Sequence, residues 1–298
     1  MMSRHFLRLR DFSVDELNNL IERAIELKRL RHDGSPHQTC ANKTLAMIFE
    51  LSSTRTRVAF EAGIAQLGGQ SIFLSPRDTQ LGRGEPIKDT ARVLAKMVDI
   101  VMIRAKDQAT IDEYARHSDI PVINGMSNEL HPCQLLADIM TIVESQGEIE
   151  GREVAFVGDG YNMCQSFIEA STIFGFDLKV ATPLDYRPSA KYVKCSNHVE
   201  FMDSPSDAVL NADVVVTDVW SSMGHEEDTH RVKAFDGFQI TSNLLDKAKH
   251  DAIFLHCLPA HRGEEVDEYV LDDPRSLVWE ESGNRLHSQK ALMEFLLN

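Results

Sequence analysis

The sequence lacks a long hydrophobic run. None of its apolar stretches approaches the ~18 residues that a membrane-spanning helix needs, so we expect no membrane partner. Three arginines stand among the first ten residues, but no apolar segment follows them, which argues against a secretory signal. The sequence shows no low-complexity segment and no fixed-period repeat, so its 298 residues are expected to form ordinary globular domains.

Cysteine is scarce and poorly spaced for cross-linking. The five cysteines are an odd number without a C-x-x-C pair, which is typical of a reduced cytoplasmic protein rather than a disulfide framework or a zinc ribbon. Basic residues are also in deficit, and a formal net charge of -15 argues against a dedicated nucleic-acid binder. A small anionic ligand stays possible, because a local arginine cluster can override the global charge.

Strand and helix patterns alternate along the chain. A serine–glutamate capping box at residues 13–16 opens the first predicted helix. Apolar strand segments separated by helix patterns follow at residues 44–49, 71–74, 99–103 and 121–124. The pattern restarts with strand segments at residues 153–157, 178–181, 214–217 and 253–255. A turn-rich stretch at residues 281–285 then leads into a terminal helix that ends at Leu297.

This alternation predicts the fold class. Parallel strands joined by helices are covered on both faces, so we expect an α/β protein of two doubly wound domains, each with a central parallel sheet flanked by helices. The first domain is expected at residues 1–147 and the second at residues 148–284. The terminal helix, at about residues 285–298, is expected to return to the first domain.

Polar side chains follow six of the predicted strands at the point where each strand ends. In open α/β sheets, ligands bind just outside the carboxyl ends of the strands, so this placement indicates binding sites. The six positions are residues 53–57, Arg104, residues 131–134, Asp159, Asp218 and residues 256–259.

The segment Ser-Thr-Arg-Thr-Arg at residues 53–57 is predicted to open a helix. Amides at a helix start point towards an anion, hydroxyl groups add donors, and arginine offers a planar fork that matches phosphate oxygens. The segment favours phosphate binding, and a capped surface helix is the alternative.

Arg104 and His131 could act together on a carbonyl oxygen. Pro132 restricts His131 to an extended conformation and then starts a helix whose first turn carries Gln134. An arginine and a neutral histidine beside a helix start can form an oxyanion clamp. Taken singly, the arginine is as readily an ion-pair partner and the histidine a structural residue.

The sequence Gly158-Asp159-Gly160 matches part of a dinucleotide-binding motif. Met163 occupies the place of the third glycine, and no acidic residue follows the strand at 178–181, which disfavours a nicotinamide dehydrogenase. Asn162, at the predicted helix start, suits a carboxylate. Asp218 could hold an ammonium group or simply cap a helix.

His256 and Cys257 raise the possibility of a metal site or a nucleophile. A zinc site needs three or four ligands with local spacing, and only His261 is near. Cys257 has no evident oxyanion partner, which disfavours a Cys–His nucleophile. We therefore predict no metal and no covalent intermediate.

Four motifs together resemble the ornithine carbamoyltransferase family: residues 53–57, His-Pro-Cys-Gln at 131–134, Asp218 with Ser-Met-Gly at 222–224, and His-Cys-Leu-Pro at 256–259. The resemblance runs from about Arg4 to the terminal helix. The first two motifs are shared with aspartate carbamoyltransferases, whereas the last two are similar to the ornithine branch. Tyr161 stands where the family often has asparagine, which puts the rim of the acceptor pocket in doubt.

The resemblance implies that carbamoyl phosphate binds the first domain. Its phosphate would lie on the 53–56 segment, Arg104 and His131 would polarise the carbonyl oxygen together with Thr56, and Gln134 would hold the carbamoyl amide. A neighbouring subunit would supply Gln80, so the site would be complete only in a homo-oligomer, usually a trimer. The implied set is Ser53, Thr54, Arg55, Thr56, Gln80, Arg104, His131, Pro132, Cys133, Gln134, Cys257, Leu258 and Arg285.

The second domain would bind L-ornithine, and the resemblance implies a set of four residues there: Asn162, Asp218, Ser222 and Met223. The implied catalytic residues are Arg55, Arg104, His131, Asp218 and Cys257. The expected reaction transfers the carbamoyl group to the δ-amine of L-ornithine, giving L-citrulline and phosphate, without a cofactor, in the cytoplasm and in arginine biosynthesis. Two alternatives stay open. One is a carbamoyltransferase for putrescine, aspartate or an acylated ornithine. The other is a catalytically silent homologue, which is disfavoured because no site residue is missing.

Overall fold

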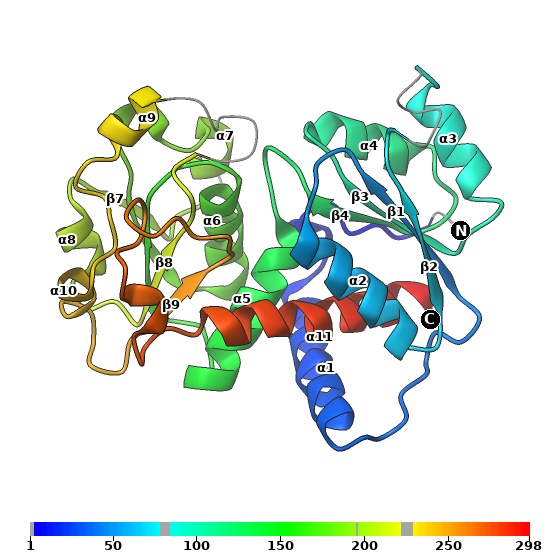
Figure 1. The fold of residues 1–298 in the computed structure, drawn as a ribbon, viewed down its shortest axis with the longest axis horizontal. Coiled ribbons are helices and arrows are strands. Elements are labelled where there is room, and N and C mark those ends of the chain that lie inside the picture. Colours follow the sequence, from blue (N-terminus) through cyan, green and yellow to red (C-terminus); the bar gives the residue numbers. More distant parts are fainter. Residues whose placement is uncertain (1–2, 78–83, 195, 222–228) are drawn as a thin grey trace. The chain divides into compact units, whose positions relative to one another are not determined.

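The structure is a computed structural model that describes residues 3–77, 84–194, 196–221 and 229–298. The chain divides into two compact units (Figure 1). The first unit consists of Met1–Met140 and Gly283–Asn298, and the second consists of Thr141–Ser282. Each unit contains one parallel sheet, so the predicted α/β fold class is confirmed.

The first unit carries a four-stranded sheet in the order β2-β1-β3-β4. The strands are β1 (Thr44–Phe49), β2 (Gln70–Leu74), β3 (Ile100–Arg104) and β4 (Val122–Met126). The helices are η1 (Leu9–Asp11), α1 (Val14–His32), α2 (Thr54–Gln66), α3 (Ile87–Leu94), α4 (Gln108–Arg116), the start of α5 (Pro132–Gln146) and most of α11 (Val278–Leu297). In Figure 1, α3 and α4 lie on one side of this sheet and α1, α2 and α11 on the other.

The strand pattern explains why helices cover both faces. Successive side chains of a strand point to opposite faces. Ala46 and Ile48 of β1 pack with Ile111 and Tyr114 of α4, while Met47, fully buried as well, faces the other side. Burial on both faces makes such strands near-continuous apolar runs, which is why the sequence predicts them well.

The second unit carries a five-stranded sheet in the order β7-β6-β5-β8-β9. The strands are β5 (Glu153–Val157), β6 (Asp177–Ala181), β7 (Val199–Met202), β8 (Val214–Thr217) and β9 (Ile253–His256). The helices are α6 (Asn162–Phe174), η3 (Leu184–Tyr186), α7 (Ala190–Val193), α8 (Pro205–Val209), α9 (Thr229–Ala234), α10 (Ser242–Leu245) and η4 (Val270–Asp272).

The β5 strand divides its side chains between two helices. Ala155 and Val157 pack in one core with Ala208 and Val209 of α8. Phe156 points to the opposite face, where its ring centroid lies 6.0 Å from that of Phe167 in α6. This is the doubly wound arrangement that the alternating pattern predicts.

The α2 helix begins at Thr54, within the segment 53–57 that was predicted to open a helix, and the Ser53 side chain caps it. Two local expectations were wrong. The strand β7 was not predicted, because this short edge strand is only partly buried and includes an exposed glutamate. The stretch 281–285 is helical, since α11 already begins at Val278. Among the helices in the described ranges, none is both long and apolar enough to cross a membrane.

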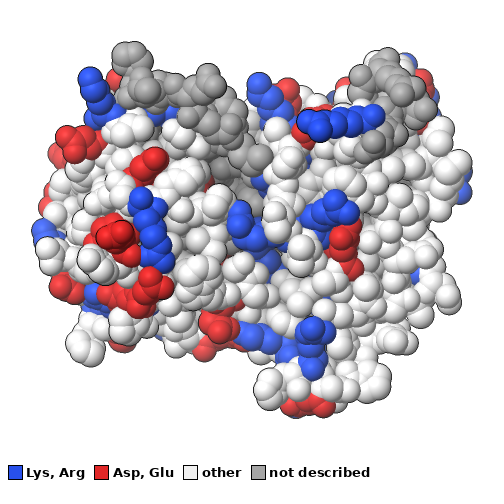
Figure 2. All heavy atoms as spheres, viewed as in Figure 1, with Lys and Arg blue, Asp and Glu red and all other residues white. Residues whose placement is uncertain are grey.

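The acidic surplus of the sequence is visible on the surface. On the face drawn in Figure 2, acidic side chains are frequent over the second unit, at the left, and sparse over the first unit, much of whose face is uncharged. A positively charged site in this chain must therefore be built locally, from particular arginines.

Candidate active site

Strand register brings the polar residues of the first unit to one edge. Phe49, the last residue of β1, pairs with Arg104, the last residue of β3. Arg104 in turn pairs with Met126 at the end of β4. The carboxyl ends of β1, β3 and β4 are therefore adjacent, and the segments that follow them carry Ser53 and His131.

Two arginines converge on one hydroxyl group at this edge. Nη1 of Arg104 lies 3.4 Å from Oγ1 of Thr56, and Nη2 of Arg285 lies 2.8 Å from the same atom. All three side chains are buried. Because the Thr56 oxygen accepts from both guanidinium groups, its own O–H proton is left to donate to a ligand oxygen. The α2 start thus carries concentrated positive charge.

The α2 helix adds backbone donors to the same place. Oγ of Ser53 accepts a hydrogen bond from the Thr56 amide at 3.2 Å and so sets the first turn. Thr54 is exposed and Arg55 is half-buried. A helix start with unpaired amides and adjacent guanidinium groups is suited to a phosphate.

His131 is neutral in this environment. Burial, and then the charges of Arg285 and Arg104, hold the pKa of His131 well below its usual value. The imidazole therefore approaches a ligand as a neutral group. The next residues lead into α5, where Nε2 of Gln134 donates to Oδ1 of Asp138 at 2.8 Å.

Cys133 is a packing residue in the structure. Its thiol is fully buried and donates to the Asn124 carbonyl at 3.2 Å. Burial raises the pKa of Cys133 to about 12, so the group stays a thiol. Any contact of this residue with a ligand would be made by its backbone.

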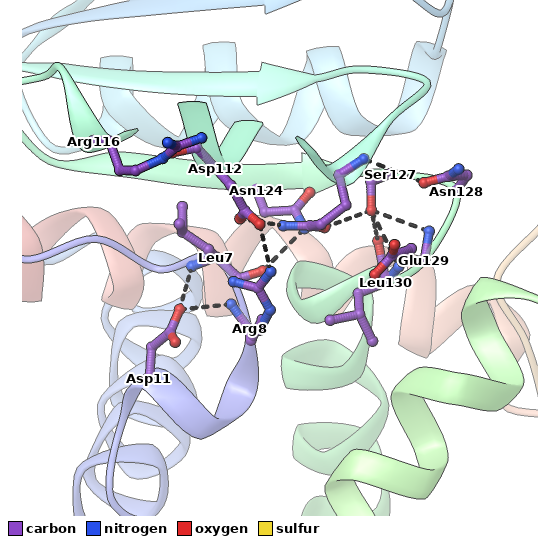
Figure 3. Close-up of polar contacts among 11 residues, drawn as sticks. Leu7, Arg8, Asp11, Asp112, Arg116, Asn124, Ser127, Asn128, Glu129 and Leu130 are labelled. Carbon is purple, nitrogen blue, oxygen red and sulfur yellow. Dashed lines mark hydrogen bonds and ion pairs between the residues drawn. The ribbon is translucent and has the colours of Figure 1, made fainter. Parts of the chain in front are cut away.

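A buried turn that sequence reasoning missed leads into His131 (Figure 3). Oγ of Ser127 accepts from the amides of Glu129 and Leu130, both at 3.2 Å. The same hydroxyl donates to Oε1 of Gln108 at 2.6 Å, and Nδ2 of Asn124 donates to that oxygen at 3.0 Å. These bonds fix the four residues that precede His131.

The network continues to the N-terminal segment. Nε2 of Gln108 donates to Asp112 at 3.0 Å, and Nη2 of Arg8 lies 2.7 Å from the other carboxylate oxygen of Asp112. Figure 3 shows Arg8, Asp112 and Asn124 gathered on one side of the Ser127 turn. A polar residue in the first turn of a helix does not by itself indicate a functional role. The role of Gln108 is therefore seen only in the fold.

The second unit repeats the same edge geometry. Val157 pairs with Thr217, and Thr217 pairs with His256, so the carboxyl ends of β5, β8 and β9 are in line. Asp218 and Cys257 follow β8 and β9 directly, and Asp159 follows β5 after Gly158.

Asp218 is the central acid of this edge. Oδ1 of Asp218 accepts from the Val219 amide at 2.8 Å and from the Cys257 thiol at 3.2 Å. Burial raises the pKa of Asp218, so its carboxylate gains from a cationic partner. An ammonium group would supply that charge.

The ring nitrogens of His256 are both engaged. Nδ1 accepts from the Leu258 amide at 2.9 Å, and Nε2 lies 3.1 Å from Oε1 of the buried Glu265. Leu258 itself has φ +55 and precedes a cis proline. Ligand atoms of Asp218, His256 and Cys257 lie within 4.8 Å of one another, as a metal would need. The imidazole could join such a site only by giving up one of its two bonds, so the residues do not favour a metal.

The glycines after β5 have a structural cause. Gly158 has φ +136, a conformation that side chains rarely adopt. A Cβ on Gly160 would lie 2.3 Å from the Tyr186 carbonyl oxygen. Gly158 therefore provides the backbone conformation of the turn, and Gly160 allows the close approach of a second backbone segment. These two needs account for the partial dinucleotide motif.

Comparison with known proteins covers both units. The carbamoyl-P binding domain of the aspartate/ornithine carbamoyltransferases matches residues 4–144, and the Asp/Orn binding domain of the same family matches residues 150–296. The chain belongs to this carbamoyltransferase family. It is thus a transferase of the carbamoyltransferase class.

Relatives extend over the whole length of the chain. The ornithine carbamoyltransferase of Acinetobacter baumannii is 55% identical over 100% of this chain and 98% of its own, and that of Chromohalobacter salexigens is 56% identical with the same coverage. The crystal structure of the Burkholderia thailandensis ornithine carbamoyltransferase has TM-score 0.92 at 48% identity, covering 99% of this chain and 98% of that one. The Pyrococcus furiosus enzyme has TM-score 0.94 at 46% identity, covering 98% and 96%.

The predicted carbamoyltransferase residues divide between the two units. The first unit holds residues 53–56, Arg104, residues 131–134 and Arg285, and the second holds Asn162, Asp218, Cys257 and Leu258. Asn162 is buried at the first position of α6, directly after Tyr161. Gln80, Ser222 and Met223 lie outside the described residues.

Proposed function

We propose that this carbamoyltransferase transfers the carbamoyl group of carbamoyl phosphate to the δ-amine of L-ornithine, giving L-citrulline and phosphate. The observation that carries the proposal is a pair of oppositely charged strand-end sites, one on each unit. The first gathers Arg104 and Arg285 on Thr56, and the second centres on Asp218. A phosphate-bearing donor suits the first site and an amino-acid acceptor suits the second.

Carbamoyl phosphate would bind the first unit through its charge and its carbonyl group. Its phosphate lies on the α2 start with Ser53, Thr54 and Arg55. Its carbonyl oxygen accepts from Thr56, Arg104 and the neutral His131. Gln134 holds the carbamoyl amide. The remaining donor-site residues are Gln80, Pro132, Cys133, Cys257, Leu258 and Arg285.

Ornithine would bind the second unit through its α-amino acid group. Asp218 holds the α-ammonium group, and Asn162 holds the α-carboxylate. Ser222 and Met223 complete the acceptor site. Cys257 donates to Asp218 at 3.2 Å and so keeps that carboxylate aimed and ionised.

The chemistry requires an unprotonated amine and a stabilised oxyanion. The δ-amine has a lysine-like pKa of about 10.4, so the chain must bind the fraction that has lost its proton. A C–N bond then forms and the carbonyl oxygen becomes an oxyanion on Arg104 and His131. The oxyanion re-forms the carbonyl as the C–O bond to phosphate breaks, and phosphate leaves with the electron pair onto Arg55 and the helix start. The amine nitrogen loses its surplus proton, and the departing phosphate takes it up.

The proposal includes a homotrimer with shared sites, in which Gln80 of a neighbouring subunit reaches the α2 start. Two features beside that start support it. Val58 of α2 is 56% exposed and Ile72 of the edge strand β2 is 45% exposed, which leaves apolar side chains for a partner to cover.

The setting that we propose is cytoplasmic arginine biosynthesis. The four described cysteines are free thiols, as in a reducing compartment. A solved relative from Campylobacter jejuni, 44% identical, with TM-score 0.92 and covering 98% of each chain, is titled an anabolic ornithine carbamoyltransferase.

A panel of acceptors tests the proposal. Purified protein is given carbamoyl phosphate with ornithine, putrescine, aspartate or acetylornithine, and the carbamoylated product and phosphate are measured. We expect turnover with ornithine at least about a hundredfold above the others, since putrescine and acetylornithine lack a charged group that the acceptor site would bind and aspartate lacks a side-chain amine. Turnover with another amine alone would keep the donor chemistry and refute the acceptor assignment.

A further inference from the structure

Arg231 makes a set of contacts beside the proposed acceptor site that the reaction scheme leaves unused. Its Nη2 forms an ion pair with Oδ2 of Asp159, and its Nε donates to the Trp220 carbonyl at 2.8 Å. Arg231 is 8% exposed and Asp159 is 5% exposed, so this pair lies inside the second unit. A buried arginine with defined partners on two other segments has a role inside the fold, unlike a charged side chain at the surface.

Aromatic rings hold the guanidinium group in place. Its carbon lies 4.6 Å from the ring centroid of Tyr186 and 5.9 Å from that of Phe235. Phe235 is fully buried and stacks on Trp220, with ring centroids 5.6 Å apart. Since the rings fill the space around the side chain, Arg231 has little freedom to find other partners.

The contacts join the two strand ends that carry the acceptor residues. Asp159 lies just after β5, three residues before Asn162. Trp220 lies just after β8, two residues beyond Asp218. Arg231, from α9, therefore connects the backbone segments of Asn162 and Asp218 to each other.

The charge of the same arginine acts on Asp159. Burial raises the pKa of Asp159 to about 7, Arg231 opposes that rise, and the charge of Asp218 adds to it. If the arginine charge were absent, the pKa of Asp159 would rise further and this acid would take up a proton, so the ion pair that joins the two strand ends would be lost.

We propose that Arg231 is a positioning residue for the acceptor: through Asp159 and the Trp220 carbonyl it fixes the strand ends that carry Asn162 and Asp218. The inference rests on the proposed function, since it assigns the acceptor to Asp218. Arg231 itself touches neither substrate. Its removal should therefore weaken acceptor binding and leave donor binding alone.

The test compares Arg231→Gln, Arg231→Lys and Asp159→Asn with wild type. We measure the KM of each substrate, kcat, and the thermal unfolding midpoint. Arg231→Gln should raise the ornithine KM about tenfold or more, while the carbamoyl phosphate KM changes less than about twofold. Arg231→Lys keeps the charge and should recover part of the loss.

The chain offers a matched control on the same two strands. Arg152 precedes β5 and pairs with Asp213, which precedes β8, at 3.4 Å. This ion pair lies at the amino ends of the strands, opposite the proposed site. Arg152→Gln should lower the unfolding midpoint without raising the ornithine KM.

A double variant tests whether both residues act through the same ion pair. Asp159→Asn breaks that pair from its other side, so it should raise the ornithine KM about as much as Arg231→Gln, and combining the two should add little to either change. A double variant much worse than both single variants would show that the two residues act separately and would overturn the role of the pair. An unchanged ornithine KM in folded Arg231→Gln, or equal changes in both KM values, would overturn the positioning role. The acceptor panel with wild-type protein tests the proposed function separately. If another amine is the substrate, the proposed function fails, and the KM of the same variants is then measured for that amine.

Discussion

At the scale of the residue, His131 shows how burial selects a chemical role. Two buried arginines and the loss of water hold the pKa of this imidazole well below its usual value. A neutral imidazole can donate one hydrogen bond to the carbonyl oxygen without adding a third positive charge beside Arg104 and Arg285. The same environment would make a protonated histidine costly.

This charge state predicts a pH profile. Because the pKa of His131 lies well below 6.5 in the folded protein, its neutral form predominates at neutral pH and its charge does not change as the pH rises to 8. We expect kcat/KM for carbamoyl phosphate, at saturating ornithine, to show no ionisation near 6.5 that belongs to His131. His131→Asn, measured across the same range, should lose about a hundredfold in kcat with an unchanged profile shape. A wild-type inflection near 6.5 that disappears in His131→Asn would refute the neutral assignment.

At the scale of the element, the turn before α5 decides where His131 points. Ser127 caps the amides of Glu129 and Leu130 and donates to Gln108. Ser127→Ala removes these bonds inside the protein, which typically costs about 1–3 kcal/mol of folding free energy. Because a small displacement of a catalytic group slows a reaction sharply, kcat should fall about tenfold or more.

A second serine provides the control for that prediction. Ser118 donates to the Ile120 carbonyl at 2.8 Å and accepts from the Ile120 amide at 3.3 Å. These bonds lie before the amino end of β4, whereas Ser127 follows its carboxyl end. Ser118→Ala should destabilise the protein comparably, seen as a lower midpoint in urea, with kcat unchanged. If both variants lose activity equally, general stability and not the turn before α5 is responsible.

The elements could be predicted where one local pattern determines them. The segments 153–157 and 214–217 were predicted as strands and form β5 and β8, since both are buried apolar runs. β7 was missed because Val199–Met202 is a half-exposed edge strand with a weak pattern. Strand order and pairing are not local properties, yet the rule that ligands bind at carboxyl ends predicted which residues would gather within each unit.

The positioning residues could not be predicted, because their partners are remote in sequence. Gln108 and Ser127 are 19 residues apart, and Arg231 and Asp159 are 72 residues apart. No spacing rule links such pairs, so only the fold brings them together. Arg285 differs in one respect: the family resemblance implied a place for it in the carbamoyl phosphate site, but its contact with Thr56, across 229 residues, is seen only in the fold.

At the scale of the whole molecule, the proposed trimer with shared sites can be tested by mixing two defective variants. Arg55→Ala removes the proposed phosphate contact of one subunit, and Gln80→Ala removes the group that the subunit would lend to its neighbour. Each variant alone should form inactive trimers, as judged by light scattering and the turnover assay. Every site in either homotrimer is then defective.

Mixing the two variants should restore activity if sites are shared. After reversible dissociation in mild denaturant and reassembly, a site is intact where an Arg55 from one variant meets a Gln80 from the other. Random assembly in a cyclic trimer makes this combination at about a quarter of the sites, so about a quarter of wild-type activity should return. The matched control pairs Arg55→Ala with Arg104→Ala, which lie in the same subunit's half of the site and cannot complement. Recovery in that control, or none with Gln80→Ala, would show that each subunit carries a complete site.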